Sequence, residues 1–194
     1  MRKIAIILFL LMTTVPFMTC ERNDMHDLAL LGLAPKNAIY LYIGGMSSGN
    51  SKGRNDSDSQ CYTAGLIYHS LIGASRVKAF RSYSFSDELR FIVPTNYWQY
   101  PVVGISPALT LTMVSSTWAS LWDGALDNPV NTSVGMPSGT YWWSGSNPDG
   151  GYSGIDCGGW QDSISTKSGQ VGGAGIGEAT LTCDTSNYVL CVAY

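Results

Sequence analysis

The positions of the cysteines constrain this chain more than any other feature of its sequence. The five cysteines are Cys20, Cys61, Cys157, Cys183 and Cys191. Cys20 directly follows an apolar leader, which leaves four cysteines, an even number, for the rest of the chain. In a small exported protein an even set of cysteines predicts disulfides. Two disulfides are therefore expected, and the spacing alone leaves three possible pairings open.

The leader has the pattern of a secretory signal. A basic pair, Arg2-Lys3, precedes an apolar run at residues 4–12. That run is shorter than the roughly 20 apolar residues that a membrane-spanning helix needs. No A-x-A cleavage pattern follows it, and Phe17-Met18-Thr19 leads directly into Cys20 instead. We expect residues 1–19 to be a signal peptide.

Residues 17–20 resemble the lipobox of bacterial lipoproteins, in which the cysteine is acylated. The usual lipobox has Leu three residues before the cysteine and a small residue directly before it. Phe17 and Thr19 depart from that pattern, although spirochaetal lipoboxes are looser. The resemblance implies a lipid on Cys20, a tether over residues 20–38 and anchoring in a bacterial outer membrane. The alternative is that Cys20 is removed with a cleaved signal.

The charge balance argues against a nucleic-acid-binding protein. Without Arg2 and Lys3 the chain has 9 basic residues against 14 acidic ones, a net charge of about −5. Nucleic-acid binding needs a basic footprint, and general attraction to polyanions needs a positive field. Only a local basic patch remains possible.

The pattern of short apolar segments predicts a single α+β domain over residues 39–194. A helix is expected from Gln60 to about Leu71, capped by Asp58 or Ser59, and a second helix over 115–126. Residues 44–60 and 131–180 are rich in Gly, Ser, Asn and Asp or Pro, which is typical of long loops. Strands are expected at 39–42, 77–83, 89–93, 101–105 and 188–193.

An ordered series of short motifs resembles the endostatin domain of certain collagens, and most closely the leptospiral endostatin-like outer-membrane lipoproteins. The resemblance covers roughly residues 39–194. Each motif is weak alone, whereas the ordered set with four cysteines is specific. The motifs are Gly44-Gly45-Met46, Asp58-x-Gln60-Cys61, Val77-Lys78-Ala79-Phe80, Pro101-Val102-Val103, Thr117-Trp118-x-x-Leu121-Trp122-x-Gly124, Trp143-x-Gly145-Ser146-x-Pro148-x-Gly150, Cys157-x-x-Trp160, Gly169-Gln170, Cys183 and Tyr188-Val189-Leu190-Cys191-Val192.

The resemblance implies a C-type-lectin-like fold with two nested disulfides, Cys61–Cys191 and Cys157–Cys183. It also implies an adhesin that binds host extracellular-matrix proteins such as laminin and fibronectin. Related members bind complement factor H and plasminogen as well. None of these partners follows from composition or spacing.

Two sets of side chains are candidates for binding. Endostatins bind heparan sulfate through arginines in the loop after Gly-Gly-Met and in neighbouring strands. The corresponding cluster here is either a weak glycosaminoglycan patch or ordinary solvated charge. Aromatic residues that the motif series leaves unexplained are candidate anchors for a protein interface. The basic candidates are Lys52, Arg54, Arg76, Lys78 and Arg81, and the aromatic ones are Trp98 and Trp142.

Catalytic and metal sites find little support in the sequence, and no cofactor is expected. His26 and His69 are the only histidines, and no G-x-S-x-G elbow is present. Mammalian endostatins hold zinc through histidines that this chain lacks, so no zinc site is expected. Asn147-Pro148-Asp149 is similar to the Pro-centred calcium motif of lectins, but Asp184 and Asn187 are wrongly spaced for its partner cluster. A Pro-containing turn is the simpler interpretation.

Two rival functions remain open beside the adhesin. The first is a lectin-type module that binds carbohydrate or glycosaminoglycan. The second is a structural envelope lipoprotein without a host ligand. A hydrolase would need a general base that the sequence does not offer.

Overall fold

The computed structural model describes residues 34–194, apart from the side chains of residues 69–71. The signal peptide, the acylation of Cys20 and most of the tether lie outside the described residues. The side chains of His26 and His69 also lie outside them. Among residues 34–194, no helix combines the length and the apolar character that a bilayer crossing requires.

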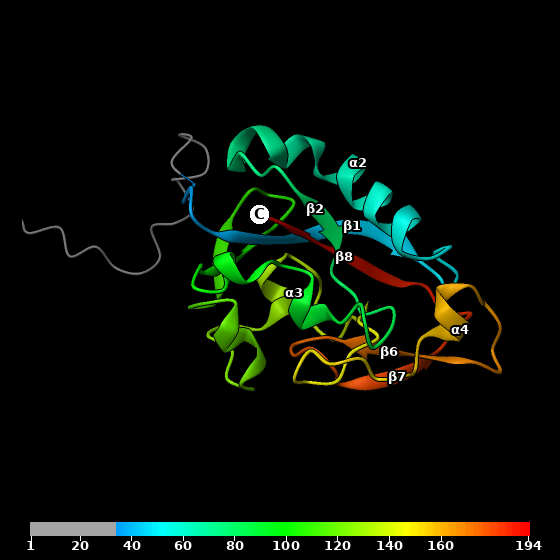
Figure 1. The fold of residues 1–194 in the computed structure, drawn as a ribbon. Coiled ribbons are helices and arrows are strands. Elements are labelled where there is room, and N and C mark those ends of the chain that lie inside the picture. Colours follow the sequence, from blue (N-terminus) through cyan, green and yellow to red (C-terminus); the bar gives the residue numbers. More distant parts are fainter. Residues whose placement is uncertain (1–33) are drawn as a thin grey trace, which may run out of the picture.

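One mixed eight-stranded sheet organises the described chain (Figure 1). Its order is β4-β3-β1-β8-β5-β6-β7, and β2 also pairs with β8. β8 therefore lies at the centre, antiparallel to β1 and β2 and parallel to β5. The strands are β1 (Ile39–Ser47), β2 (Val77–Ala79), β3 (Val102–Ile105), β4 (Leu111–Ser115), β5 (Trp142–Trp143), β6 (Ser168–Gly172), β7 (Ala179–Thr182) and β8 (Asn187–Ala193).

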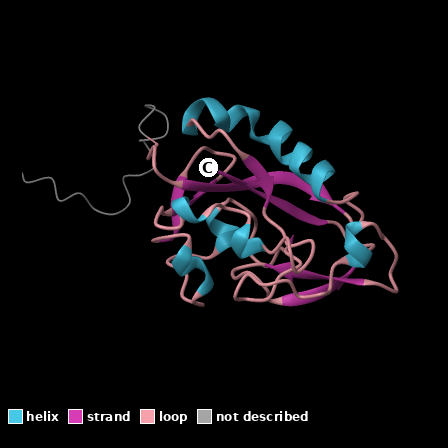
Figure 2. Ribbon diagram, viewed as in Figure 1, coloured by secondary structure: helices cyan, strands magenta, loops and turns pink. Residues whose placement is uncertain are grey.

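The one long helix of the described residues, α2 (Arg54–Ile72), packs against β1, β2 and β8 on one side of the sheet (Figure 1). The other helical segments are short turns within long loops on the opposite side and at one end (Figure 2). These short segments are η1 (Leu89–Phe91), η2 (Thr95–Tyr97), η3 (Ala119–Trp122), α3 (Val130–Ser133) and α4 (Cys157–Trp160).

Alternation along the central strands creates a hydrophobic core on each face of the sheet. In β1, Ile39 and Leu41 join one core, whereas Tyr40 and Tyr42 join the core beneath α2. This is the two-residue period of a strand that is buried on both sides. The expectation that 188–193 forms a strand buried on both faces is confirmed, since β8 alternates in the same way.

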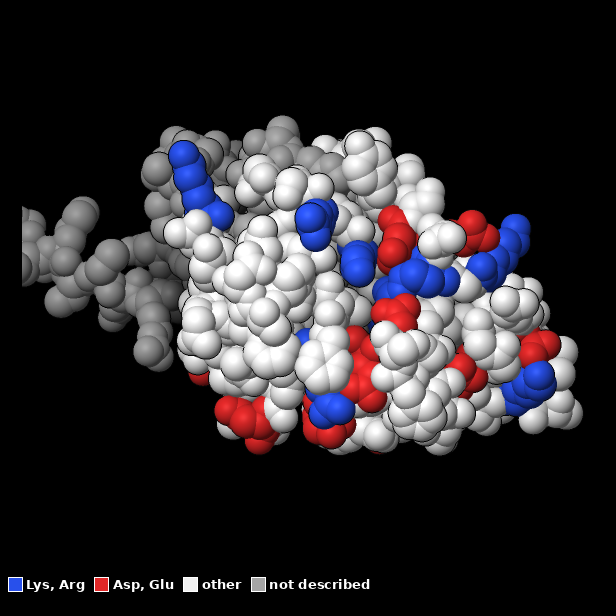
Figure 3. Space-filling model, viewed as in Figure 1, with Lys and Arg blue, Asp and Glu red and all other residues white. Residues whose placement is uncertain are grey.

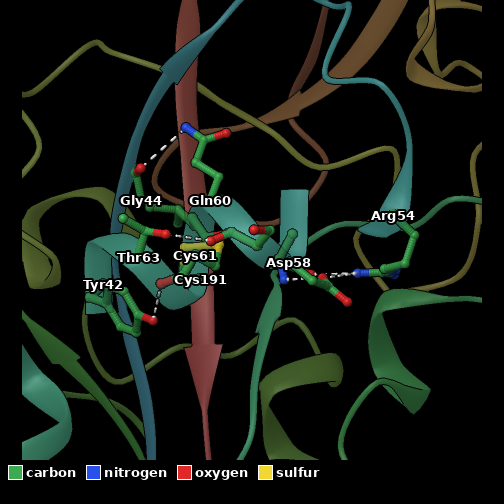
Figure 4. Close-up of a disulfide and its surroundings, with 11 residues drawn as sticks. Tyr42, Gly44, Arg54, Asp58, Gln60, Cys61, Thr63 and Cys191 are labelled. Atoms are coloured by element: carbon green, nitrogen blue, oxygen red, sulfur yellow. Dashed lines mark hydrogen bonds and ion pairs between the residues drawn. A yellow bond between two sulfur atoms is a disulfide. The ribbon is translucent and has the colours of Figure 1, made fainter. Parts of the chain in front are cut away.

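Two nested disulfides pin these layers, as the motif series implies. Cys61 of α2 is bonded to Cys191 of β8, and Cys157 is bonded to Cys183. Figure 4 shows the first bond between helix and strand, beside Gly44. The Tyr42 hydroxyl donates a 2.8 Å hydrogen bond to the carbonyl of Cys61. The predicted α+β class and both pairings are confirmed.

The boundaries of the first helix differ from those expected. The segment 44–60 is not one loop, because β1 continues to Ser47 and α2 begins at Arg54 rather than Gln60. The first turn of α2 has few apolar residues, so hydrophobic periodicity does not reveal it. Polar contacts hold it instead: Asp58 accepts a 2.7 Å hydrogen bond from the Ala79 amide, and Arg54 donates one to the Ala79 carbonyl.

Other segments also correct the expectations. The strand expected at 77–83 ends at Ala79, and the segment 131–180 contains β5, β6 and β7. The strand expected at 89–93 is instead the helical turn η1. The helix expected at 115–126 is only η3, preceded by the unpredicted strand β4. Ala34 and Ala38, within the expected tether, are buried beneath the end of α2.

Candidate binding surface

Arg54 is committed to contacts within the protein. Its guanidinium forms a forked pair with Asp87, with hydrogen bonds of 2.7 and 2.8 Å, and lies 4.1 Å from the centre of the Tyr83 ring. It also donates to the carbonyls of Ala79 and Arg81. A forked guanidinium with this many acceptors is a structural tie between α2 and the segment after β2. It is not a free charge for a polyanion.

Arg81 is fully buried, so its assignment to a surface patch is wrong. Its guanidinium lies 4.3 Å from the Trp160 ring and donates a 2.6 Å hydrogen bond to Ser51 Oγ. Burial lowers the pKa of Arg81, and Tyr83 partly opposes this fall. The prediction fails because the chain after β2, which ends at Ala79, turns the Arg81 side chain inward onto Trp160 and Ser51.

Three of the five basic candidates remain accessible. Lys52 and Arg76 are exposed, and Lys78 is half-buried. Figure 3 shows basic and acidic side chains interleaved on the visible face rather than one broad basic area. Asp58, which Lys78 influences electrostatically, lies within this region. The predicted glycosaminoglycan patch is thus reduced to three cations with acidic neighbours.

The two aromatic candidates have different environments. Trp142 is fully buried on β5 and packs against Phe80 in a tilted arrangement with ring centroids 5.2 Å apart, so its assignment as a surface anchor is wrong. Trp98 is half-buried, and its indole N–H donates a 3.0 Å hydrogen bond to the Val93 carbonyl. One side of its ring stacks on Phe91, with centroids 6.0 Å apart and an angle of 19°.

Among residues 34–194, Phe91 is one of two strongly exposed phenylalanines that sequence reasoning missed. Phe85 is 80% exposed and Phe91 is 57% exposed. Phe85 packs edge-on against Tyr152 at 5.0 Å. A signal for Phe85 is available in the sequence, since it is flanked by serines in Ser84-Phe85-Ser86, where no apolar period buries it. We call Phe85, Tyr152, Phe91 and Trp98 the aromatic strip.

Charged groups join the two halves of the aromatic strip. Arg90 lies 4.9 Å from the Phe91 ring centre and forms a 2.8 Å ion pair with Glu88. Glu88 in turn accepts from the Tyr152 amide, and Arg90 also reaches Asp149 at 3.5 Å. The strip is therefore a continuous series of contacts from Phe85 to Trp98.

Tyr152 is held in place at one end of the aromatic strip. Its hydroxyl donates a 2.5 Å hydrogen bond to Asp156. Burial, followed by Asp156, raises the pKa of Tyr152 to about 12. Tyr152 is therefore a neutral hydrogen-bonded aromatic at physiological pH, and it supports the exposed Phe85 ring rigidly.

The segment Asn147-Pro148-Asp149 forms a tight turn. The Gly150 amide donates to the Asn147 carbonyl at 2.9 Å, and Asp149 accepts from the Gly151 amide. Within residues 34–194, no group of three or more His, Cys, Asp or Glu side chains gathers in a metal-binding arrangement. The carboxylate of Asp149 thus accepts a hydrogen bond within this turn and forms an ion pair with Arg90.

A small hollow of about 240 Å³ opens at the start of β8. Its lining has no charged side chain and combines two tyrosines with polar groups. The lining residues are Met46, Gly139, Thr140, Tyr141, Ser186, Asn187 and Tyr188. The Asn187 side-chain amide donates a 3.0 Å hydrogen bond to Thr185 Oγ1, so this group of the lining is already engaged.

Comparison with models of known protein families and with curated proteins finds no match to this chain.

Proposed function

We propose that this protein is a surface-displayed lipoprotein adhesin that binds host extracellular-matrix proteins such as laminin and fibronectin. In this proposal Cys20 is acylated and holds the chain in a bacterial outer membrane. The domain is of the endostatin-like, C-type-lectin-like kind, and complement factor H and plasminogen are further candidate ligands. The α+β architecture and the two nested disulfides support this reading, because the endostatin resemblance implies both.

The aromatic strip is the observation that carries the proposal. Aromatic side chains with a neighbouring arginine are the residues most often found at the energetic centre of protein interfaces. Full burial of a phenylalanine contributes roughly 1.5–3 kcal/mol. Phe85 and Phe91 are mostly exposed and rest on rigid supports, so little conformational entropy is lost when a partner covers them.

The charges favour a protein ligand over a glycosaminoglycan. Arg54 and Arg81 are occupied by contacts inside the protein, and Lys52, Arg76 and Lys78 remain for a polyanion. Heparan sulfate recognition depends on several adjacent cations that displace counterions. Three cations with acidic neighbours in an acidic domain offer a weak attraction.

Direct binding of the full-length protein to laminin and fibronectin tests the proposal. Replacing Phe85 and Phe91 together by serine should weaken binding at least tenfold, since each is expected to act as an interface anchor. Ile164→Ser is the matched control, because Ile164 is 48% exposed and lies outside the strip. Unchanged binding of the double variant would reject the strip as the interface.

The full-length protein also serves to distinguish the adhesin from its two rival functions. Exposed aromatic rings also stack on sugar faces, so a glycan array with and without chelator is the decisive comparison. Calcium-dependent glycan binding without matrix-protein binding would favour the lectin. Loss of binding on reversal of Lys52, Arg76 and Lys78 to glutamate would favour a glycosaminoglycan. Absence of any binding would favour a structural envelope role.

A further inference from the structure

Arg81 has more hydrogen-bond donors than the protein supplies with acceptors. The residue has no exposed surface, and Nη1 donates to Ser51 Oγ at 2.6 Å. Nε and Nη2 are buried, and no acceptor among the described residues reaches them with normal hydrogen-bond geometry. Buried polar groups in folded proteins are nearly always paired, so two unpaired donors on one guanidinium call for a physical cause.

The aromatic neighbours of Arg81 do not satisfy these donors. The Trp160 ring lies 4.3 Å from the guanidinium carbon and contributes a cation–π attraction. A guanidinium, however, directs its N–H bonds within its own plane, away from a ring that covers its face. The buried hydroxyl of Tyr83 is near enough to interact with the guanidinium, but it forms no hydrogen bond of normal geometry with it or with another described residue. The centre of the Tyr83 ring lies 5.9 Å from the guanidinium carbon.

The charge of Arg81 is not neutralised by a carboxylate. Arginine stays protonated in proteins, and the ionisable groups that act on Arg81 are Tyr83 and Arg54. Arg54 repels Arg81, and the carboxylate of Asp87 is already occupied by its forked ion pair with Arg54. Ser51 precedes the N-terminus of α2, whose helix dipole adds further positive potential. A buried, unpaired cation of this kind is strongly unfavourable.

We propose that the protein binds a chloride-sized monovalent anion beside Arg81, where Nε, Nη2 and the Tyr83 hydroxyl donate to it. A single negative charge balances the guanidinium, and a spherical acceptor suits three donors that come from two side chains. A buried water molecule would accept the hydrogen bonds but would leave the charge uncompensated. The site is internal and structural, and it is independent of the aromatic strip.

Thermal unfolding of the full-length protein at constant ionic strength provides the test, with chloride replaced stepwise by gluconate. An anion that binds only the folded state raises the melting temperature by about 3–6 °C at ten times its dissociation constant. The rise should follow a saturable one-site curve, and bromide should replace chloride. A melting temperature that does not depend on the anion would overturn the proposal.

Two variants and one control test whether the anion dependence of the melting temperature arises at Arg81. Tyr83→Phe keeps the ring that supports Arg54 and removes one donor, so it should weaken the anion dependence several-fold. Arg81→Met should abolish it, while Arg76→Met, which removes an exposed cation, should leave it unchanged. An Arg81→Met protein that keeps the chloride dependence would place the anion elsewhere.

Crystals grown in bromide add a direct measurement. An anomalous peak within hydrogen-bond distance of Arg81 Nε and Nη2 is the expected result. Density for water alone at this position, without an anomalous signal, would contradict the proposal even if the protein were stabilised by salt. This measurement does not depend on whether Arg81→Met folds.

Discussion

At the scale of single residues, glycines leave the space that the disulfides occupy. A Cβ atom added at Gly44 would lie 2.4 Å from Cys191 Sγ, and one added at Gly49 would lie 2.4 Å from Cys157 Sγ. Gly44 also coincides with a register shift between β1 and β8. These positions need glycine for close approach rather than for a left-handed backbone.

Gly44→Ala should therefore destabilise the protein by about 1–3 kcal/mol, because the methyl group collides with a covalent bridge that cannot move aside. Chemical denaturation measures this loss, and a thiol assay shows whether Cys61 and Cys191 still pair. The control is Gly175→Ala, where the added atom would meet only the flexible end of Glu178 at 3.3 Å. Equal stability of the two variants would show that the bridge adjusts freely.

Arg54→Lys tests the tie between α2 and the segment after β2. Lysine keeps the charge but lacks the planar fork that serves Asp87 and two carbonyls together, so a loss of about 1–3 kcal/mol is expected. Urea denaturation measures the loss. Lys52→Met, at an exposed neighbouring position, should stay within about 0.5 kcal/mol of the parent protein.

At the scale of elements, the central strands can be predicted from the sequence, whereas the short helical turns cannot. β1, β3 and β8 combine β-branched or aromatic residues with burial on both faces, which is a strong pattern. In η1 and the two residues after it, the buried residues Leu89, Ile92 and Val93 have the spacing i, i+3, i+4. That helical period is present in the sequence, but the five residues before Pro94, four of them apolar, also fit a strand.

The disulfides and the candidate binding residues also divide into features that the sequence predicts and features that it does not. The two disulfides follow from motif order, whereas the roles of Arg54 and Arg81 depend on contacts with residues about 30 positions away. Such long-range polar contacts leave no local periodicity. Phe85 and Phe91 are detectable only as apolar residues that no core pattern accounts for.

Asp58 links the first turns of α2 to β2, and this link should depend on pH. Burial raises the pKa of Asp58 above 3.8, while the Ala79 amide and Arg54 partly oppose the rise. The folded state thus binds this proton more tightly than the unfolded chain. The contribution of Asp58 to stability is full below pH 3.8 and is lost as the pH rises through the raised pKa.

Asp58→Asn should remove that dependence, because the amide does not ionise and its oxygen can still accept from Ala79. The stability of Asp58→Asn relative to the parent protein should improve as the pH rises from 3.8, by about 1.4 kcal/mol for each unit of pKa shift. Guanidinium denaturation between pH 3.5 and 7 measures it. Asp56→Asn reports the effect of removing an exposed charge from the same turn, and parallel curves for Asp58→Asn and the parent protein would refute the expectation.

At the scale of the whole molecule, the two disulfides close very different lengths of chain. Cys61–Cys191 spans 130 residues and joins α2 to the central strand. Cys157–Cys183 spans 26 residues and lies within a smaller core with Trp143 and Trp160. By the chain-entropy relation these bonds contribute about 5 and about 3.5 kcal/mol, respectively.

Replacing Cys61 and Cys191 together by alanine should accordingly destabilise the protein more than replacing Cys157 and Cys183. The pairwise replacement avoids free thiols in both variants. Thermal and urea denaturation, compared with the parent protein under oxidising and reducing conditions, give the two losses. A larger loss for the Cys157 and Cys183 pair would mean that packing around Trp143 and Trp160 outweighs loop closure.

The central position of β8 has a consequence for the timing of assembly. Synthesis proceeds from the N-terminus, so β1 and β3 on one side, and β5, β6 and β7 on the other, are complete before β8 exists. Cys157 and Cys183 precede Cys191 in the chain, so they become available to Cys61 before its native partner does. A nascent chain stalled before Asn187 should therefore be sensitive to proteases and prone to form mispaired disulfides. Insertion of β8, the decisive step of folding, then comes after nearly all of the chain has been synthesised.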